Sequence, residues 1–186
     1  MSIDPLGQSL LTIARNSIAK KFGMRTRTAI QHPALVKHAA TFVTLTQQGQ
    51  LRGCIGSLEA YRSLALDVTE NALAAATKDP RFPPLKQTEL EGTRIEVSLL
   101  DTPHKLLFSD EADVLNQLCP GIDGLILSSG RHRATFLPQV WESLPTPKLF
   151  LEHLKVKAGL SADFWSSDLT LSRYSVQKWK EAEHHS

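Results

Sequence analysis

The chain has 186 residues, a length typical of one domain, and an ordinary composition with 41% hydrophobic and 22% charged residues. This composition excludes a disordered, collagenous, coiled-coil or disulfide-scaffold protein. The formal net charge of +2 is too balanced to indicate nucleic-acid or membrane-surface binding through charge alone. No apolar run approaches the roughly 18 residues of a membrane span.

The first predicted element is a helix that begins at Asp4-Pro5. Aspartate can cap the free N–H groups, and proline fits the first helical position. Apolar residues such as Leu10 and Ile18 recur at helical spacing, and Gly23 ends the pattern.

A β-hairpin is predicted next, because residues 41–46 and 51–55 flank a short polar turn. Ser63 can cap a helix to about Thr77, whose small apolar residues would allow close packing on a sheet. Residues 91–100 then alternate as a strand does.

The second half repeats this mixture of helices and strands. A short helix at about 110–118 precedes a second hairpin, residues 124–128 with 133–137, and Thr146-Pro147 begins another helix. The last strand is predicted over 169–179, with a bulge near Arg173 where the alternation slips. Tight hairpins among helices predict an α+β fold with a largely antiparallel sheet.

The segment from Arg52 to Gly56 is the first candidate for chemistry. Glycines in a strand mark a bulge or a close approach, and here Gly53 and Gly56 flank Cys54. A period of two places Arg52 and Cys54 on one face, on the order of 7 Å apart, where the guanidinium would favour a thiolate and could hold an anion. The alternative is a buried, inert cysteine in a tightly packed strand.

Other polar candidates lie in a loop, a strand and a turn. The stiff loop after the second helix can present Asp79 and Arg81 to a ligand, or the two can simply pair. Glu96 and Ser98 share the polar face of their strand, which is either solvated or lines a site with Glu96 as general base. Asp123 lies in a Gly-rich segment where a turn role competes with binding.

Several other chemistries have no support. None of the seven histidines has a metal-ligand spacing, no phosphate-binding or dinucleotide fingerprint occurs, and no nucleophile elbow is present. We therefore expect no metal site and name no cofactor. No secretory signal precedes the domain, so we expect a cytoplasmic protein in which Cys54 and Cys119 are free thiols.

The motifs as a set resemble the AMMECR domain family. The resemblance runs in order over roughly residues 8–180, and Leu51-Arg52-Gly53-Cys54-Ile55-Gly56 is its most specific motif. The other matching segments are Phe42–Leu45, Asp79–Leu85, Ile95–Leu100, Pro120–Leu127, Phe136–Trp141, Phe150–Leu154 and Lys157–Leu160.

The resemblance implies one domain, residues 8–180, with two unequal lobes and a cleft between them. The larger lobe is expected over 1–100 plus 168–186 and the smaller over 101–167. Prokaryotic members are similar to protein A of the AmmeMemoRadiSam system, which implies Memo-like and radical-SAM partners, and the family has no agreed activity. The matched polar positions are Arg52, Cys54, Asp79, Arg81, Glu96, Ser98 and Asp123; Cys119 lies outside the pattern.

Two functions follow as hypotheses. In the first, the protein is a thiol-dependent enzyme or cofactor-handling component. Cys54 and Glu96 are then catalytic, and Arg52, Gly53, Gly56, Asp79, Arg81, Ser98 and Asp123 contact a small-molecule substrate. In the second, it is a non-catalytic scaffold that binds a protein partner, and the Arg-Gly-Cys segment is structural. Nucleic-acid binding is disfavoured, because it needs several clustered cations.

Overall fold

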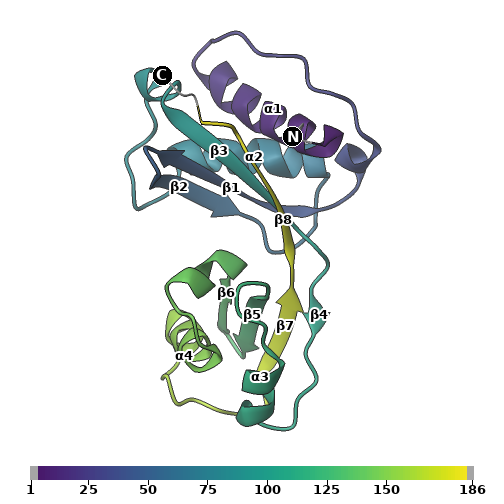
Figure 1. The fold of residues 1–186 in the computed structure, drawn as a ribbon, viewed down its shortest axis with the longest axis vertical. Helices are drawn as coiled ribbons and strands as arrows, with labels where there is room; N and C mark the ends of the chain where they lie inside the picture. The colour runs from purple at the N-terminus through teal and green to yellow at the C-terminus, as the bar shows by residue number, and fades with distance from the viewer. Residues whose placement is uncertain (1–3, 184–186) are drawn as a thin grey trace. The chain divides into compact units, whose positions relative to one another are not determined.

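The structure is a computed structural model that describes residues 4–183. It divides into two compact units, Met1–Leu100 with Gln177–Ser186, and Asp101–Val176. Each unit has a four-stranded sheet and its own hydrophobic cluster (Figure 1). The α+β class with antiparallel sheets is therefore confirmed.

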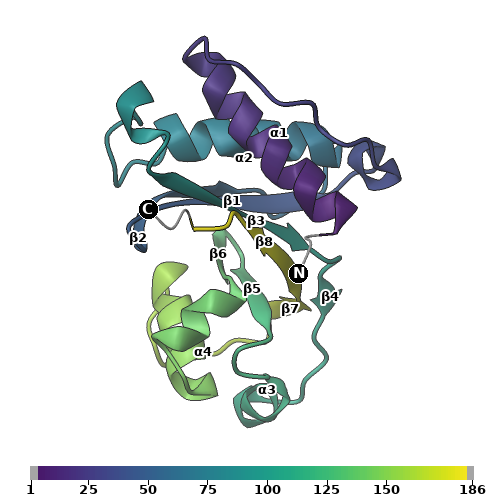
Figure 2. The same ribbon diagram turned by 45° about the horizontal axis from the view of Figure 1, so that its top comes forward.

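The first unit is a sheet with two helices on one face. The sheet has the strand order β2-β1-β3-β8, formed by β1 (Ala40–Gln47), β2 (Gln50–Gly56), β3 (Thr93–Leu100) and β8 (Val176–Lys180). Helices α1 (Pro5–Lys21) and α2 (Leu64–Thr77) cover one face of it (Figure 2). The short 3-10 helices η1 (Pro33–Val36) and η2 (Gln87–Glu89) lie in the connections.

Both helices begin where the capping residues predict. The Asp4 carboxylate accepts a hydrogen bond from the Gly7 N–H at 3.0 Å, and the Ser63 hydroxyl accepts one from the Leu66 N–H. Gly23 follows α1 with a positive φ of 67°, a conformation that favours glycine at a helix end.

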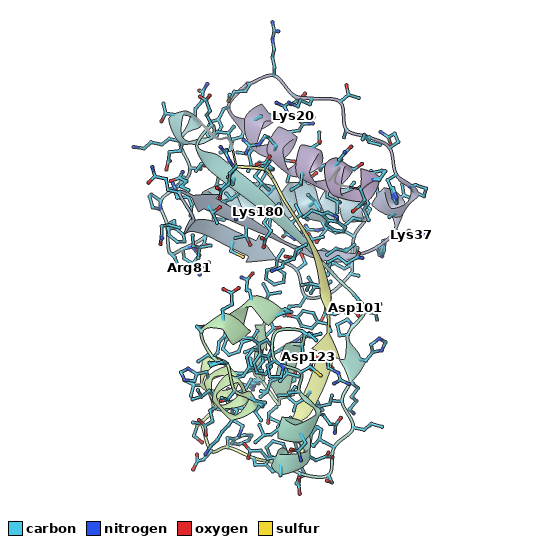
Figure 3. The ribbon with its side chains drawn as sticks, in the orientation of Figure 1. Lys20, Lys37, Arg81, Asp101, Asp123 and Lys180 are labelled. Atoms are coloured by element: carbon cyan, nitrogen blue, oxygen red, sulfur yellow. The ribbon has the colours of Figure 1, made fainter. Side chains whose placement is uncertain are left out.

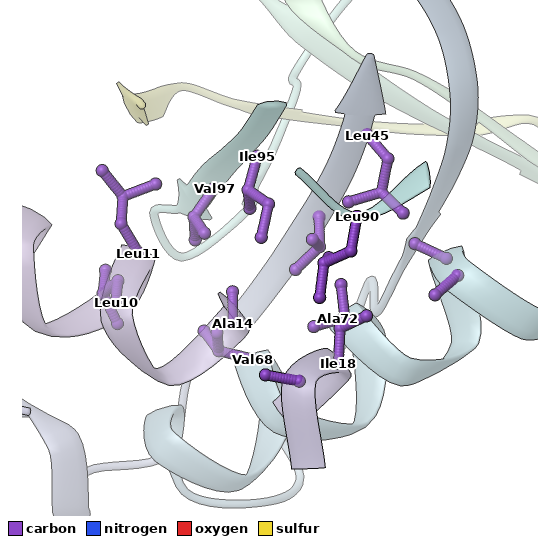
Figure 4. Packing of buried hydrophobic residues seen from close by; sticks show 14 of the residues in the cluster. Leu10, Leu11, Ala14, Ile18, Leu45, Val68, Ala72, Leu90, Ile95 and Val97 are labelled. Atoms are coloured by element: carbon purple, nitrogen blue, oxygen red, sulfur yellow. The ribbon is translucent and has the colours of Figure 1, made fainter. Parts of the chain in front are cut away.

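The core of the first unit lies between these helices and the sheet. Leu10 and Ile18 of α1 pack with Leu45 and further apolar residues of the central strands (Figure 4). Val43 belongs to the same cluster and, like these three leucine and isoleucine side chains, is fully buried. Because neighbouring side chains along a strand point to opposite faces, the residues between these apolar ones point away from the helices. The helix-free face of this sheet therefore carries the candidate residues.

The second unit packs its helices against a second antiparallel sheet. Strand order is β4-β7-β5-β6, from β4 (His104–Lys105), β5 (Gly124–Ser129), β6 (His132–Phe136) and β7 (Thr170–Tyr174). The helices are α3 (Glu111–Gln117), α4 (Pro147–Lys157) and the 3-10 helix η3 (Pro138–Glu142). Trp141 stacks on Phe150 with ring centroids 3.8 Å apart in this unit's core.

The C-terminal segment differs from the single bulged strand that the sequence predicts. It forms two strands, β7 in the second sheet and β8 in the first, with Ser175 between them. Asp101 fixes this change of sheet, because its carboxylate accepts bonds from the Ser175 N–H at 2.6 Å and from the Ser175 hydroxyl at 3.0 Å. The slip in alternation thus marks passage between sheets, and β7 belongs to the second unit.

Candidate functional site

Cys54, Thr44 and Glu96 form a row across three strands. In the strand register Thr44 lies opposite Cys54 of β2 on one side and opposite Glu96 of β3 on the other. Directly opposed residues have Cβ atoms about 5 Å apart and point to the same face. The Cys54 Sγ lies 3.2 Å from the Thr44 Oγ1, within hydrogen-bonding distance. The row thus places a thiol, a hydroxyl and a carboxylate side by side on the helix-free face.

The loop after α2 fastens onto β2 through Asp79. Its carboxylate accepts bonds from the Cys54 N–H at 2.9 Å and from the Arg81 Nη2, Nε and backbone N–H at 2.8–3.0 Å. These bonds hold the pKa of the buried Asp79 carboxyl well below its usual range, the Arg81 guanidinium having the largest effect. Because β2 is an edge strand, Asp79 also caps an outward N–H that would otherwise lack a partner.

The pair with Asp79 positions the Arg81 side chain but occupies only part of its guanidinium group. This side chain is 54% exposed (Figure 3 labels Arg81). Its guanidinium lies over the Phe82 ring. Asp79 engages the Nε and Nη2 atoms, so the Nη1 atom still faces outward from the pair. Arg81 is therefore the site cation with a donor to offer a ligand.

Arg52 does not lie beside Cys54 as strict alternation predicts. The register shifts between Leu45 and Thr46, which pair with Gly53 and Leu51, so Arg52 is the extra residue of a bulge. Its guanidinium forms a bidentate pair with Glu89 at 3.0 and 3.2 Å. The buried Arg52 thus holds the end of the loop that carries Glu89. The positive charge that lowers the pKa of the Cys54 thiol comes from Arg81.

The Cys54 thiol is half-buried and protonated at neutral pH. Burial raises the pKa of the thiol above its ordinary value, and the negative charges of Asp79 and Glu96 raise it further. The Thr44 hydrogen bond and the Arg81 charge act in the opposite direction but do not overcome burial. The site holds a neutral thiol rather than a standing thiolate.

Glu96 and Ser98 follow the same face of β3 at different depths. Glu96 is half-buried, and its carboxylate has no hydrogen bond or ion pair to any residue of 4–183. Ser98 is buried and lies opposite Phe42 of β1. It is two residues along β3 from Glu96, so it is the next residue on the same face. Glu96 is therefore the carboxylate of the row that has no hydrogen bond or ion pair within residues 4–183.

Both glycines of the segment are required by packing. A Cβ on Gly53 would collide with the Ala75 carbonyl oxygen of α2, and one on Gly56 would enter the Phe42 ring. The glycines thus let α2 approach β2 and let Phe42 lie across the strand. Packing alone therefore explains why both positions are glycine, without a bound ligand.

Asp123 belongs to the second unit and closes a turn there. Its carboxylate accepts the Cys119 N–H at 2.8 Å and lies 3.7 Å from the Arg173 Nη1. Its backbone oxygen accepts the Trp141 indole N–H at 2.7 Å. These contacts account for Asp123 as a turn residue.

Thr44, Glu89 and Asp67 are structural members of the site region that sequence reasoning missed. The Asp67 carboxylate is buried beneath β1, where it accepts bonds from Thr41, Ser57, Arg62 and Asn71. Both Asp67 and Thr44 could have been found from the sequence. Asp67 lies in the first turn of the predicted helix, where a carboxylate is expected, and Thr44 lies opposite Cys54 in the predicted hairpin. Nothing in the local sequence links Glu89 to Arg52.

Residues 4–183 meet the requirements of neither a metal site nor a membrane-spanning helix. Among residues 4–183, no group of three or more His, Cys, Asp or Glu side chains could hold a metal ion; His184 and His185 lie outside that range. Both cysteines are free, Cys54 half-buried and Cys119 exposed. No helix within this described range is long and apolar enough to cross a membrane.

The fold and the Arg-Gly-Cys strand place the protein in a known family. The AMMECR1 family model matches residues 11–179, so the chain belongs to the AMMECR1 family. A protein from Methanothermobacter thermautotrophicus is 36% identical over 184 residues, covering 94% of each chain. One from Sulfolobus acidocaldarius is 36% identical, covering 88% of this chain and 75% of the relative.

A solved structure has the same fold. The crystal structure of uncharacterized protein PH0010 from Pyrococcus horikoshii superposes with a TM-score of 0.86 at 30% sequence identity. The match covers 96% of this chain and 93% of that chain. The family is thus established, and these names state no reaction.

Proposed function

We propose that the protein is a thiol-dependent enzyme or cofactor-handling component, with Cys54 as the reactive thiol and Glu96 as general base. The observation that carries this is the row of Cys54, Thr44 and Glu96, in which the Glu96 carboxylate has no partner among residues 4–183. A nucleophile with a weakly acidic proton needs an adjacent base at the moment of attack.

The roles follow from the charges of the site. Cys54 stays protonated until a substrate arrives, and Glu96 then accepts the proton, directly or through the Thr44 hydroxyl. The outward Nη1 atom of Arg81 binds an oxygen of the substrate. Asp79 and Arg52 position the loop rather than touch the reacting atoms.

The remaining matched positions complete the predicted binding surface. Ser98 and Gly56 extend the Cys54 face. Gly53, whose missing side chain would face α2, and Asp123 in the second unit are kept as substrate-binding residues on the resemblance alone. The resemblance also supplies the proposed context, a cytoplasmic protein that acts with Memo-like and radical-SAM partners. Co-purification of those partners with a tagged chain tests this context separately from the chemistry.

The chemistry is tested by comparing two reactions of Cys54 in a Cys119→Ala background. The first is alkylation by iodoacetamide. The second is formation of a dithiothreitol-resistant adduct, seen by intact mass, from the small-molecule fraction of a cell extract of the source organism. Glu96→Gln removes a negative charge that raises the Cys54 pKa, so alkylation at pH 7.5 should become faster rather than slower.

Adduct formation should respond in the opposite direction. Loss of a general base costs about 100-fold or more in a proton-transfer step, so Glu96→Gln should slow the adduct strongly. Glu91→Gln removes an exposed carboxylate on the turn before β3; it is the matched control and should change neither rate. Absence of a Cys54-dependent adduct, or acceleration of both reactions by Glu96→Gln, would refute the enzyme.

A non-catalytic scaffold that binds a protein partner is the second candidate. Most of the Arg-Gly-Cys segment can be explained without a substrate. Gly53 and Gly56 are required by packing, Arg52 forms an ion pair with Glu89, and Asp79 forms one with Arg81. In this case Cys54→Ser lowers the free energy of unfolding while partner binding persists. Unchanged stability with loss of the adduct favours the enzyme.

A further inference from the structure

A groove of about 610 Å³ lies between α1 and α2 in the first unit, away from the Cys54 row. The two helices lie side by side over the sheet face opposite to that row (Figure 2). The lining residues come from both helices and from the C-cap of α2.

The rim of the groove is basic. Lys20 and Lys21 occupy the last turn of α1, and Lys78 is the C-cap of α2 (Figure 3 labels Lys20). All three are exposed, and none of their ammonium groups makes a hydrogen bond or ion pair to a residue of 4–183. The negative helix ends account for lysine at these positions but leave the ammonium groups facing water. Glu70 is the single carboxylate of the lining.

Three apolar side chains contribute to the lining of the groove. Ile13, Leu73 and Ala74 are half-buried there. The hydroxyls of Ser17, Thr69 and Thr77 donate to carbonyls of their own helices at 2.7–2.8 Å, so their protons are already used within the helices. An occupant therefore meets both aliphatic side chains and lysine ammonium groups.

We propose that this groove docks a short acidic segment of a partner protein that carries an aliphatic side chain. Three unpartnered lysines match acidic residues, and the Leu73–Ala74 floor matches the aliphatic anchor. The helix stretch from 69 to 78 spans about 14 Å, the length of about four extended residues.

Charge and composition favour a peptide over other polyanions. The lining has no aromatic ring on which a base could stack, and Glu70 would face a continuous run of phosphates. A peptide can place an amide or hydroxyl opposite Glu70 instead. Since the groove and the Cys54 row lie on opposite faces of the sheet, a docked partner leaves the thiol exposed to substrate.

The test is selection of a phage-displayed random heptapeptide library on the immobilised full chain. Enriched sequences should be acidic with one or two aliphatic residues. The tightest of them, made as a fluorescein-labelled peptide, should lose at least tenfold in affinity with the variant Lys20→Glu/Lys21→Glu/Lys78→Glu. Ala74→Trp, which fills the groove without changing charge, should have a similar effect.

The matched control reverses three exposed lysines outside the groove, Lys37→Glu/Lys105→Glu/Lys148→Glu, and should leave affinity within twofold. Thermal unfolding establishes that each variant folds. An unenriched library, enrichment of basic or neutral peptides, equal losses in the control, or tighter binding of oligodeoxythymidylate or phosphatidylserine vesicles than of the peptide would overturn the proposal.

Discussion

At Gly53 a single missing Cβ lets a helix and a strand meet. The Ala75 carbonyl oxygen of α2 occupies the space that a side chain would need. Gly56 has a softer neighbour, the Phe42 ring, which is half-buried and can rotate. The cost of adding a methyl group should therefore differ between the two glycines.

We expect Gly53→Ala to lower the free energy of unfolding by about 2–3 kcal/mol, because backbone atoms cannot move aside as a side chain can. Gly56→Ala should cost less, about 1 kcal/mol. Gly92→Ala is the control, because its nearest neighbour is 3.8 Å away and its φ is not in the left-handed region. Urea unfolding measures all three. Equal effects at Gly53 and Gly92 would contradict the packing role.

Single residues also show where sequence reasoning ended. The importance of Cys54 and its glycines could be predicted, because glycine in a strand is unusual locally. The partner of Arg52 could not, since Glu89 lies 37 residues away and the pair depends on a bulge that shifts the register. Charge near the thiol was expected from Arg52 and is supplied by Arg81.

At the level of elements, the connection from α2 to β3 is fastened at two points. Asp79 bonds the Cys54 N–H near its start, and Glu89 pairs with Arg52 near its end. Glu89 also accepts the Lys86 N–H at 2.8 Å, which closes the turn of η2. A loop held at both ends keeps Arg81 in place beside β2.

The Glu89 pair predicts a pH dependence of unfolding. Its bonds to Arg52 lower the pKa of Glu89 from 4.5 to about 2 in the folded protein. Because the pKa of Glu89 is lower in the folded than in the unfolded chain, the ionised carboxylate stabilises the fold. This contribution to the free energy of unfolding is complete above pH 4.5 and is lost as the pH falls toward 2. Glu89→Gln should cost about 2 kcal/mol at pH 7 and much less at pH 2.5.

Glu91→Gln, on the exposed turn before β3, serves as control and should stay within about 0.5 kcal/mol at both pH values. Urea unfolding at pH 7 and pH 2.5 provides the measurement. A loss of equal size at the two pH values would show that Glu89 acts through packing rather than charge.

Elements with local signals were predicted best. Asp4-Pro5, Ser63 and Thr146-Pro147 cap helices in the structure because capping depends on three or four neighbouring residues. The C-terminal strand was predicted as one element, because nothing local tells that its halves pair with different sheets. That change depends on Asp101, which is 74 residues from Ser175.

At the scale of the whole chain, each unit has a core of its own. Leu10, Ile18 and Val43 belong to the first cluster, and Trp141 and Phe150 to the second. The second unit is continuous in sequence, Asp101–Val176, whereas the first is completed by the C-terminal residues. Folding of the two units should therefore be separable.

We expect the fragment 101–176 to fold alone with a stability of at most about 3–5 kcal/mol, the range for a core of this size. The Trp141–Phe150 stack and the indole bond to Asp123 should give it a near-ultraviolet circular dichroism signal that disappears cooperatively in urea. In the full chain, Phe150→Ala should cost about 3–5 kcal/mol in the second unit. Amide exchange should then lose protection in β5 and β7, while β1 and β3 keep theirs. A fragment without cooperative unfolding, together with equal loss of protection in all four strands, would show one cooperative domain instead.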